Sequence, residues 1–320
     1  MIKMDKKDKI YIAGHNGMVG SSIIKKLQSQ GYTNLIYRSS KELDLRCQKD
    51  VNIFFQIEKP LFVFIAAAKV GGIIANDTFR AEFIYDNLVI QSNLINASKE
   101  NNVKKLLFLG SSCIYPKNCK QPIKEKYLLR GSLERTNEPY AIAKIAGLKL
   151  CESYYHQYGC EFISLMPTNL YGPNDNYDLK SSHVLPALIR KFHEAKINQK
   201  KEVIVWGDGT PRREFLHVDD LADACLFSMN NVKANDIYND LKLSHINIGT
   251  GIDITIKELA QFIKDIIKYD GEIIFDTSKP NGTPQKLLDM TITNKLGWSN
   301  KINFRQGLTE VINQYVLNYK

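Results

Sequence analysis

The sequence predicts an α/β fold, a doubly wound and mostly parallel sheet with a smaller, mostly helical substrate domain in the C-terminal half. Three observations carry this prediction. Short apolar runs alternate with segments long enough for crossover helices, a glycine-rich turn directly follows the first run, and the texture of the chain changes after Pro167. Alternating strands and helices are typical of parallel sheets whose strands are joined by helices.

The first elements are a strand, a tight turn and a helix. The apolar run 9–13 is followed by three glycines and then by apolar residues at helical spacing, Ile23, Ile24 and Leu27. Further short apolar runs predict the next strands at residues 35–37, 61–65, 106–109 and 162–165.

The second half of the chain is expected to alternate between two domains. Gly172-Pro173, the polar stretch 174–182 and an amphipathic segment from near His183 suggest entry into a second domain. We expect residues 1–172, with returns near 214–249, to form a Rossmann-type NADP-binding domain, and residues 173–213 and 250–320 to form the substrate domain. Within these parts, segments 213–220 and 245–249 are predicted to return to the sheet, and segments 255–268 and 303–319 to be helices of the smaller domain.

Composition narrows the class of protein. The 320 residues are 44% hydrophobic and 24% charged, and no apolar run approaches the ~20 residues that cross a bilayer. The charged start resembles no signal peptide, so we expect a cytoplasmic protein without a membrane partner. Six cysteines without C-x-x-C spacing argue against a metal site or a disulfide framework. The net charge of +9 is spread along the chain, which favours a lysine-rich surface with a local anion site over nucleic acid as partner.

The glycine turn predicts a dinucleotide site. Its residues lie where a pyrophosphate would meet a helix N-terminus, and they are Gly14, His15, Asn16, Gly17, Met18, Val19 and Gly20. After the second predicted strand the chain has Arg38 and no adjacent carboxylate, which favours NADP(H) because a cation accepts the 2′-phosphate. A merely solvated Arg38 is the alternative.

Tyr140 and Lys144 form the most informative pair. Their four-residue spacing on a helix places a phenol and an ammonium on one face. A phenol titrates near ~10, so a neighbouring cation is needed to make it an effective acid-base group. Ser111 or Ser112, after the fourth predicted strand, could bond the same substrate oxygen. The plain alternatives are an ordinary amphipathic turn and serines that cap a loop.

In this order, the glycine turn, the strand-end serine and the Tyr-x-x-x-Lys motif resemble the extended short-chain dehydrogenase/reductase family. Longer segments are similar to the GDP-L-fucose synthases over nearly the whole chain, namely residues 66–72, 110–117, 137–144, 166–173 and 213–220. The resemblance implies epimerisation of GDP-4-dehydro-6-deoxy-D-mannose at C3 and C5, and then NADPH-dependent reduction of the C4 ketone to give GDP-L-fucose.

The resemblance also implies roles for individual residues. Cys113 would be the base and His183 the opposing acid, each with an ordinary pKa near enough to neutrality for proton exchange. Tyr140 would protonate the C4 oxygen, while Lys144 holds the nicotinamide ribose and Ser111 steadies the ketone. The cofactor would be bordered by Leu109, Gly110, Ser111, Ser112, Tyr140, Lys144, Pro167, Thr168, Asn169, Leu170 and His183. The GDP part of the substrate would contact Lys191, Trp206 and Arg213.

Some positions depart from the resemblance or allow other interpretations. Asn16 and Ser40 stand where arginines are expected, and Lys191 where arginine is frequent. On sequence alone, Cys113 could be a small buried hydrophobe, His183 a helix-start residue and Trp206 core filling. The alternative enzyme is an NAD-dependent nucleotide-sugar 4-epimerase or 4,6-dehydratase; a cofactor-binding protein without activity would lack Tyr140 or Lys144. Long predicted helices around 81–99 and 140–158 could pair in a homodimer.

Overall fold

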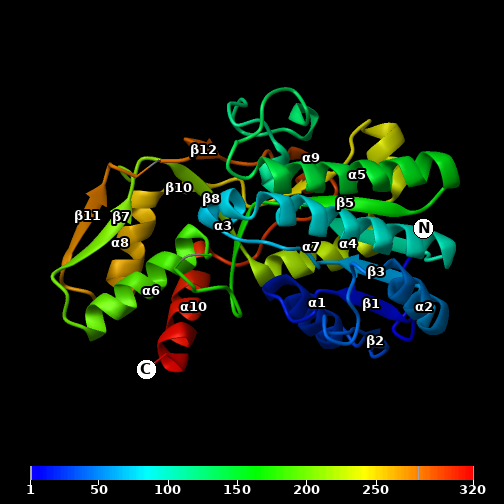
Figure 1. Ribbon diagram of the computed structural model, residues 1–320, viewed down its shortest axis with the longest axis horizontal. Coiled ribbons are helices and arrows are strands. Elements are labelled where there is room, and N and C mark those ends of the chain that lie inside the picture. The colour runs from blue at the N-terminus through cyan, green and yellow to red at the C-terminus, as the bar shows by residue number, and fades with distance from the viewer. Residues whose placement is uncertain (1, 180, 280, 320) are drawn as a thin grey trace.

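A six-stranded parallel sheet forms the centre of the larger part of the molecule in the computed structural model, which describes residues 2–179, 181–279 and 281–319 (Figure 1). The strand order is β2-β1-β3-β4-β5-β9, and every neighbouring pair is parallel. The strands are β1 (Ile10–Ala13), β2 (Leu35–Ile36), β3 (Phe62–Ile65), β4 (Lys105–Leu109), β5 (Phe162–Pro167) and β9 (Ile246–Ile248). The predicted fold class is confirmed, and β9 is the expected return near residues 245–249.

Burial explains why these runs form the sheet. All residues of β1, β3, β4 and β5 are buried, as expected for parallel strands covered on both faces. The chain leaves β1 in one direction to β2 and then crosses back to β3, which makes the β1–β3 junction a topological switch point. Ligands of open α/β sheets bind at such points, beyond the carboxyl ends of the strands.

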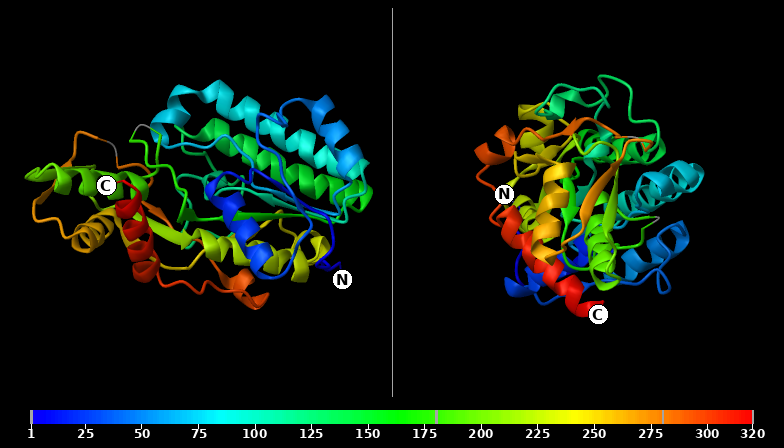
Figure 2. Two further views of the ribbon diagram at one scale, coloured as in Figure 1. Left: turned by 90° about the horizontal axis from the view of Figure 1, so that it is seen from below. Right: turned by 90° about the vertical axis from the view of Figure 1, so that its left-hand side faces the viewer.

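Helices cover both faces of the sheet, as the left view of Figure 2 shows. On one face, α1 (Met18–Ser29) packs against α7 (Val218–Asn231). On the other face, α4 (Arg80–Glu100) packs against α5 (Glu138–Tyr158) and α2 (Gln48–Glu58). The short α3 (Ile73–Thr78) precedes α4, and α5 ends at Gly159, whose φ of 69° is left-handed.

The segment after Arg212 differs from the expectation. Strand β8 (Arg212–His217) does not return to the six-stranded sheet, because β9 occupies the place beside β5. It forms a separate sheet with β10 (Asp253–Thr255), β12 (Gln285–Lys286) and β6 (Asn169–Tyr171). Helix α7, which follows β8 directly, packs in the larger part, and Leu216 of β8 belongs to the core of that part.

The smaller part, at the left of Figure 1, has its own apolar core. Its helices are α6 (Val184–Ile197), α8 (Ile256–Ile267) and α10 (Phe304–Asn318), beside a two-stranded sheet of β7 (Glu202–Trp206) and β11 (Glu272–Asp276). Helix α8 begins with a capping box in which Thr255 and Glu258 bond each other's backbone N–H groups. The remaining short elements are η1 (Ser112–Ile114), η2 (Glu125–Tyr127), η3 (Asp236–Asp240) and α9 (Thr291–Lys295).

Some residues near the C-terminus pack in the larger part of the molecule. Leu288, Met290 and Trp298 belong to the core of the larger part, although the sequence analysis expected residues 250–320 in the smaller domain. The smaller core draws instead on residues of α6, α8 and α10. The domain limits given above therefore remain a prediction, and α9 lies with the larger part.

Candidate active site

The strand-end serine loop and the Tyr140 helix are held together at the carboxyl edge of β4. Ser111 is the N-cap of η1, and its hydroxyl accepts a bond from the Cys113 N–H at 3.5 Å. Tyr140 lies in the first turn of α5, and Lys144 follows one turn later. The Lys144 ammonium donates to the Leu109 carbonyl at 2.8 Å, so α5 is tied directly to the end of β4.

Burial sets the charge states of the Tyr140–Lys144 pair. It lowers the pKa of Lys144 to about 8, against a smaller opposing effect of Cys113, so the ammonium form dominates at neutral pH. The Lys144 nitrogen lies 5.7 Å from the centre of the Tyr140 ring. Burial, followed by Cys113, raises the pKa of the Tyr140 phenol, while Ser111 lowers it by less. The phenol therefore holds a proton that it can donate.

Cys113 and His183 lie on separate elements: Cys113 is in η1, and His183 directly precedes α6. Cys113 is buried, and burial raises the pKa of its thiol; Lys286 is the strongest opposing influence. His183 precedes α6 and makes no capping bond with its side chain. Its residue surface is exposed, yet the surrounding protein atoms lower the pKa of the imidazole by desolvation, and Lys286 lowers it further.

A backbone contact fixes the turn that leads into α6. The Gly72 N–H donates to the Ser181 carbonyl at 2.7 Å. A Cβ atom on Gly72 would overlap the Ser182 carbonyl oxygen, so only glycine permits this approach. The segment 66–72 thus positions the residue before His183.

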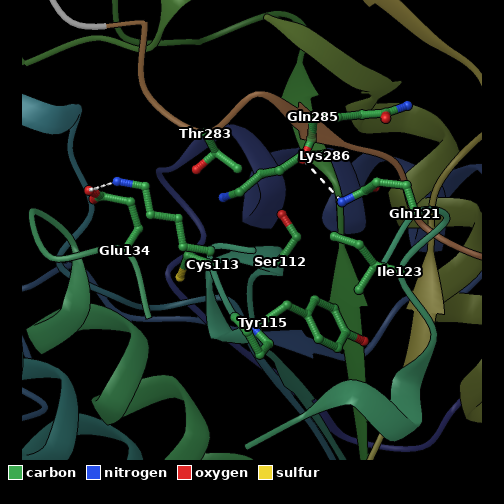
Figure 3. Close-up of a pocket in the computed structure, with 11 residues that line it drawn as sticks. Ser112, Cys113, Tyr115, Gln121, Ile123, Glu134, Thr283, Gln285 and Lys286 are labelled. Atoms are coloured by element: carbon green, nitrogen blue, oxygen red, sulfur yellow. Dashed lines mark hydrogen bonds and ion pairs between the residues drawn. The ribbon is translucent and has the colours of Figure 1, made fainter. Parts of the chain in front are cut away.

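Figure 3 shows a pocket between the η1 loop and β12. Its lining includes Ser112, Cys113, Tyr115, Thr283 and Lys286. The Lys286 side chain extends into this pocket with its ammonium toward Thr283, and Cys113 lines the same pocket. Sequence reasoning missed Lys286, because one lysine on a two-residue strand of a lysine-rich chain carries no recognisable signal.

Two cationic clusters lie at the substrate side. The Lys191 ammonium donates to the Ile204 carbonyl at 3.0 Å and lies 5.5 Å from the Trp206 ring centre. Trp206 is 48% exposed, which contradicts the core-filling alternative and leaves the ring open for stacking. Burial lowers the pKa of Arg213 to about 10, and β12 places Lys286 directly opposite it.

The glycine turn fits a dinucleotide pyrophosphate. Gly17 is the N-cap of α1 and offers no side-chain cap, and no acidic residue stands in the first turn. Gly14 has a φ of +88°, and a Cβ there would lie 2.6 Å from the Ala67 nitrogen; one on Gly20 would overlap the Gly14 carbonyl oxygen. Close packing of this turn leaves the helix N–H groups free for an anion.

At the adenosine end, Arg38 is neither free nor simply solvated. Its guanidinium forms an ion pair with Glu58 at 2.7 Å and donates to the Tyr37 carbonyl at 2.9 Å. His15 stacks on Tyr37 with ring centres 4.6 Å apart. Ser40 and Asn16 are exposed. A 2′-phosphate bound by Arg38 would have to share it with Glu58.

Hydrogen bonds to β8 hold the segment that follows β5. The Thr168 hydroxyl and the Asn169 amide both donate to the Glu214 carbonyl, at 3.3 and 2.9 Å. The Glu214 carboxylate in turn accepts backbone N–H groups of Thr250, Gly251 and Leu288. This network fixes residues 167–170 at the carboxyl end of β5, although the binding roles of these residues remain predictions.

No helix within residues 2–179, 181–279 and 281–319 has the length and apolarity to span a membrane. In the same ranges, no group of three or more His, Cys, Asp or Glu side chains is arranged to hold a metal ion.

Comparison with known proteins decides the family. The NAD dependent epimerase/dehydratase family matches residues 10–249. The chain belongs to this family. Members at high identity include GDP-L-fucose synthase 1 of Arabidopsis thaliana, 56% identical over 98% of this chain and 95% of the relative, and GDP-L-fucose synthase of Escherichia coli (strain K12), 53% identical over 98% of both. The resemblance to GDP-L-fucose synthases is therefore confirmed.

Solved structures of the epimerase/dehydratase family share the whole fold. A GDP-mannoheptose C4 reductase from Campylobacter jejuni, solved with NADP bound, superimposes with a TM-score of 0.90 at 44% identity and covers 98% of this chain and 99% of its own. The comparison supports an NADP-dependent enzyme of the epimerase/reductase type.

Proposed function

We propose that the chain converts GDP-4-dehydro-6-deoxy-D-mannose to GDP-L-fucose by epimerisation at C3 and C5 followed by NADPH-dependent reduction at C4. The observation that carries the proposal is the grouping of Ser111, Cys113, Tyr140 and Lys144 at one strand end, with electrostatic coupling of Cys113 to Tyr140 and Lys144. The identity of 53–56% to GDP-L-fucose synthases supports it.

Epimerisation needs one base, one acid and a place for negative charge. The C4 ketone acidifies the protons on C3 and C5, so a Cys113 thiolate can remove one of them and leave an enolate. The enolate oxygen accepts hydrogen bonds from Tyr140 and Ser111. His183, as imidazolium, then gives a proton to the opposite face of the same carbon. The configuration is inverted, and the two side chains exchange protons with solvent before the next turnover.

Reduction uses the same oxygen position. Bound NADPH supplies a hydride to C4. Tyr140 donates its phenolic proton to the C4 oxygen, so that the ketone becomes an alcohol, and the Lys144 ammonium stabilises the phenolate that remains. The Ser111 hydroxyl holds the C4 oxygen in position by a hydrogen bond. Because the Tyr140 phenol and the Lys144 ammonium dominate at neutral pH, the side chains start in the required protonation states.

The ligands follow from the clusters described above. NADP(H) would bind over the glycine turn with Arg38 toward its 2′-phosphate, and no metal would be required. Lys191 and Arg213 would neutralise the GDP phosphates, and Trp206 would stack on the guanine or ribose. A homodimer through α4 and α5 is supported by exposed Tyr85 and Ile142 on these helices. A cytoplasmic location remains a prediction.

The test is to incubate the purified protein with GDP-4-dehydro-6-deoxy-D-mannose and NADPH, follow nicotinamide absorbance and identify the product by NMR. GDP-L-fucose is the expected product. Reduction with C3 and C5 unchanged would instead indicate a plain GDP-sugar C4 reductase, which is the activity named for the Campylobacter jejuni neighbour. Absence of NADPH oxidation would favour a 4-epimerase or 4,6-dehydratase.

A further inference from the structure

The backbone on both sides of Lys286 is fixed. Gln121 donates through its amide to the Gln285 carbonyl at 3.2 Å and accepts from the Leu287 N–H at 3.0 Å. Strand β12 also pairs with β8, where Lys286 stands opposite Arg213. These contacts hold the backbone of Lys286 at the rim of the pocket. Figure 3 shows that its side chain extends from there into the pocket.

Lys286 lacks the partners that a half-buried ammonium normally finds. Among the described residues it makes no hydrogen bond and no ion pair, although an ammonium carries three donors. The nearby Glu134 is engaged with Lys117 and with Thr136. Desolvation and Arg213 both disfavour the charge on Lys286, and Cys113 is the strongest influence that favours it.

Lys286 in turn affects the pKa of Cys113. The Ser111 hydroxyl, Lys144 and a backbone hydrogen bond also lower the pKa of Cys113, and each acts less strongly than Lys286. Cys113 in turn raises the pKa of Tyr140. Lys286 also lowers the pKa of His183, which makes its imidazolium a stronger acid. A cation at this position thus favours the Cys113 thiolate and disfavours the protonated form of His183.

We propose that Lys286 is a positioning residue of the proton-transfer site, whose ammonium lies in the same pocket as Cys113, stabilises its thiolate and so keeps this side chain ready to accept a proton. The role of the thiolate in epimerisation rests on the proposed function, whereas the coupling of Lys286 to Cys113 does not. When Cys113 takes a proton from C3 or C5, the negative charge moves to the substrate enolate, still inside the field of the ammonium.

The competing interpretation is that Lys286 and Arg213 together bind phosphate. Both are cations on adjacent strands, and neither forms an ion pair with a carboxylate in the described chain. A phosphate ligand would be lost on substitution without any change in the chemistry of the thiol. The two interpretations therefore predict different results in the free protein.

The first experiment needs no substrate. The rate at which iodoacetamide alkylates Cys113 is measured against pH by mass spectrometry of its peptide, since only the thiolate reacts. In Lys286→Met we expect the midpoint for Cys113 to rise by about one pH unit, the lower end for loss of an opposite charge at short range. Lys286→Arg should restore most of the shift, and Lys126→Met, an exposed lysine of η2, should have the wild-type midpoint. Circular dichroism verifies folding, and Lys286→Gln replaces Met if that variant unfolds.

The second readout is exchange of solvent deuterium into C3 and C5 of the GDP-sugar. At pH 7, Lys286→Met should exchange about tenfold more slowly, as one pH unit implies, and recover as the pH is raised. An unchanged Cys113 midpoint in both Lys286→Met and Lys286→Gln, with or without a higher KM for the GDP-sugar, would overturn the proposal and favour a substrate ligand. A shifted midpoint in a protein whose wild type exchanges no deuterium would support the coupling and refute the proposed function.

Discussion

An Arg38 that binds a 2′-phosphate must share its guanidinium with Glu58, so removal of Glu58 should strengthen selection of NADPH. Arg38 and Glu58 approach to 2.7 Å, with side chains 37% and 18% exposed. A partly exposed pair of this kind is worth about 0.2–1 kcal/mol, which a phosphate must displace or share. Glu58→Gln removes this competition together with a negative charge beside the phosphate site.

The expected gain is about 0.5–1 kcal/mol toward NADPH, the upper half of that range. At about 1.4 kcal/mol per tenfold, this lowers the KM for NADPH about two- to fivefold. NADH has no 2′-phosphate, so its KM should not change. The assay measures initial rates with each cofactor at saturating GDP-sugar. Glu100→Gln, which breaks the exposed Lys99–Glu100 pair, is the matched control. Equal improvement for both cofactors, or none for NADPH, would refute the assignment of Arg38.

Three further predictions concern stability, pH and positioning. Lys105→Met should destabilise the fold by about 1–3 kcal/mol in urea, because the buried ammonium donates to the Ser228, Met229 and Val232 carbonyls; exposed Lys104→Met should have little effect. Lys144 is charged below its pKa of about 8, so kcat/KM for reduction should fall as pH rises through 8, and Lys144→Met should lack this alkaline limb. Gly72→Ala should slow deuterium exchange at C3 and C5 more than it weakens NADPH binding, because the new Cβ displaces the turn before α6.

Local patterns in the sequence were sufficient to predict most of the larger part. Strand β1 and the glycine turn are contiguous, and the four-residue spacing of Tyr140 and Lys144 is read directly from a helix. Burial on both faces makes the central strands mostly apolar, which distinguishes them from their surroundings.

Long-range pairing was harder to predict. Residues 212–217 were predicted to join the central sheet, but which sheet they join depends on β9 having taken the place beside β5. The contribution of Lys286 depends on a two-residue strand more than 150 residues after Cys113. The Arg38–Glu58 ion pair likewise joins a strand end to the end of α2, and no local spacing indicates it.

The central claim is that one pocket performs two reactions with different side chains. Its most direct test compares Cys113→Ser with Tyr140→Phe, following deuterium exchange at C3 and C5 without NADPH and NADPH oxidation with the same GDP-sugar. The account predicts that Cys113→Ser loses about 10²–10⁴-fold in exchange, and that Tyr140→Phe exchanges deuterium at a rate nearer the wild type while losing reduction by a similar factor. Wild-type exchange in Cys113→Ser, or wild-type reduction in Tyr140→Phe, would contradict it.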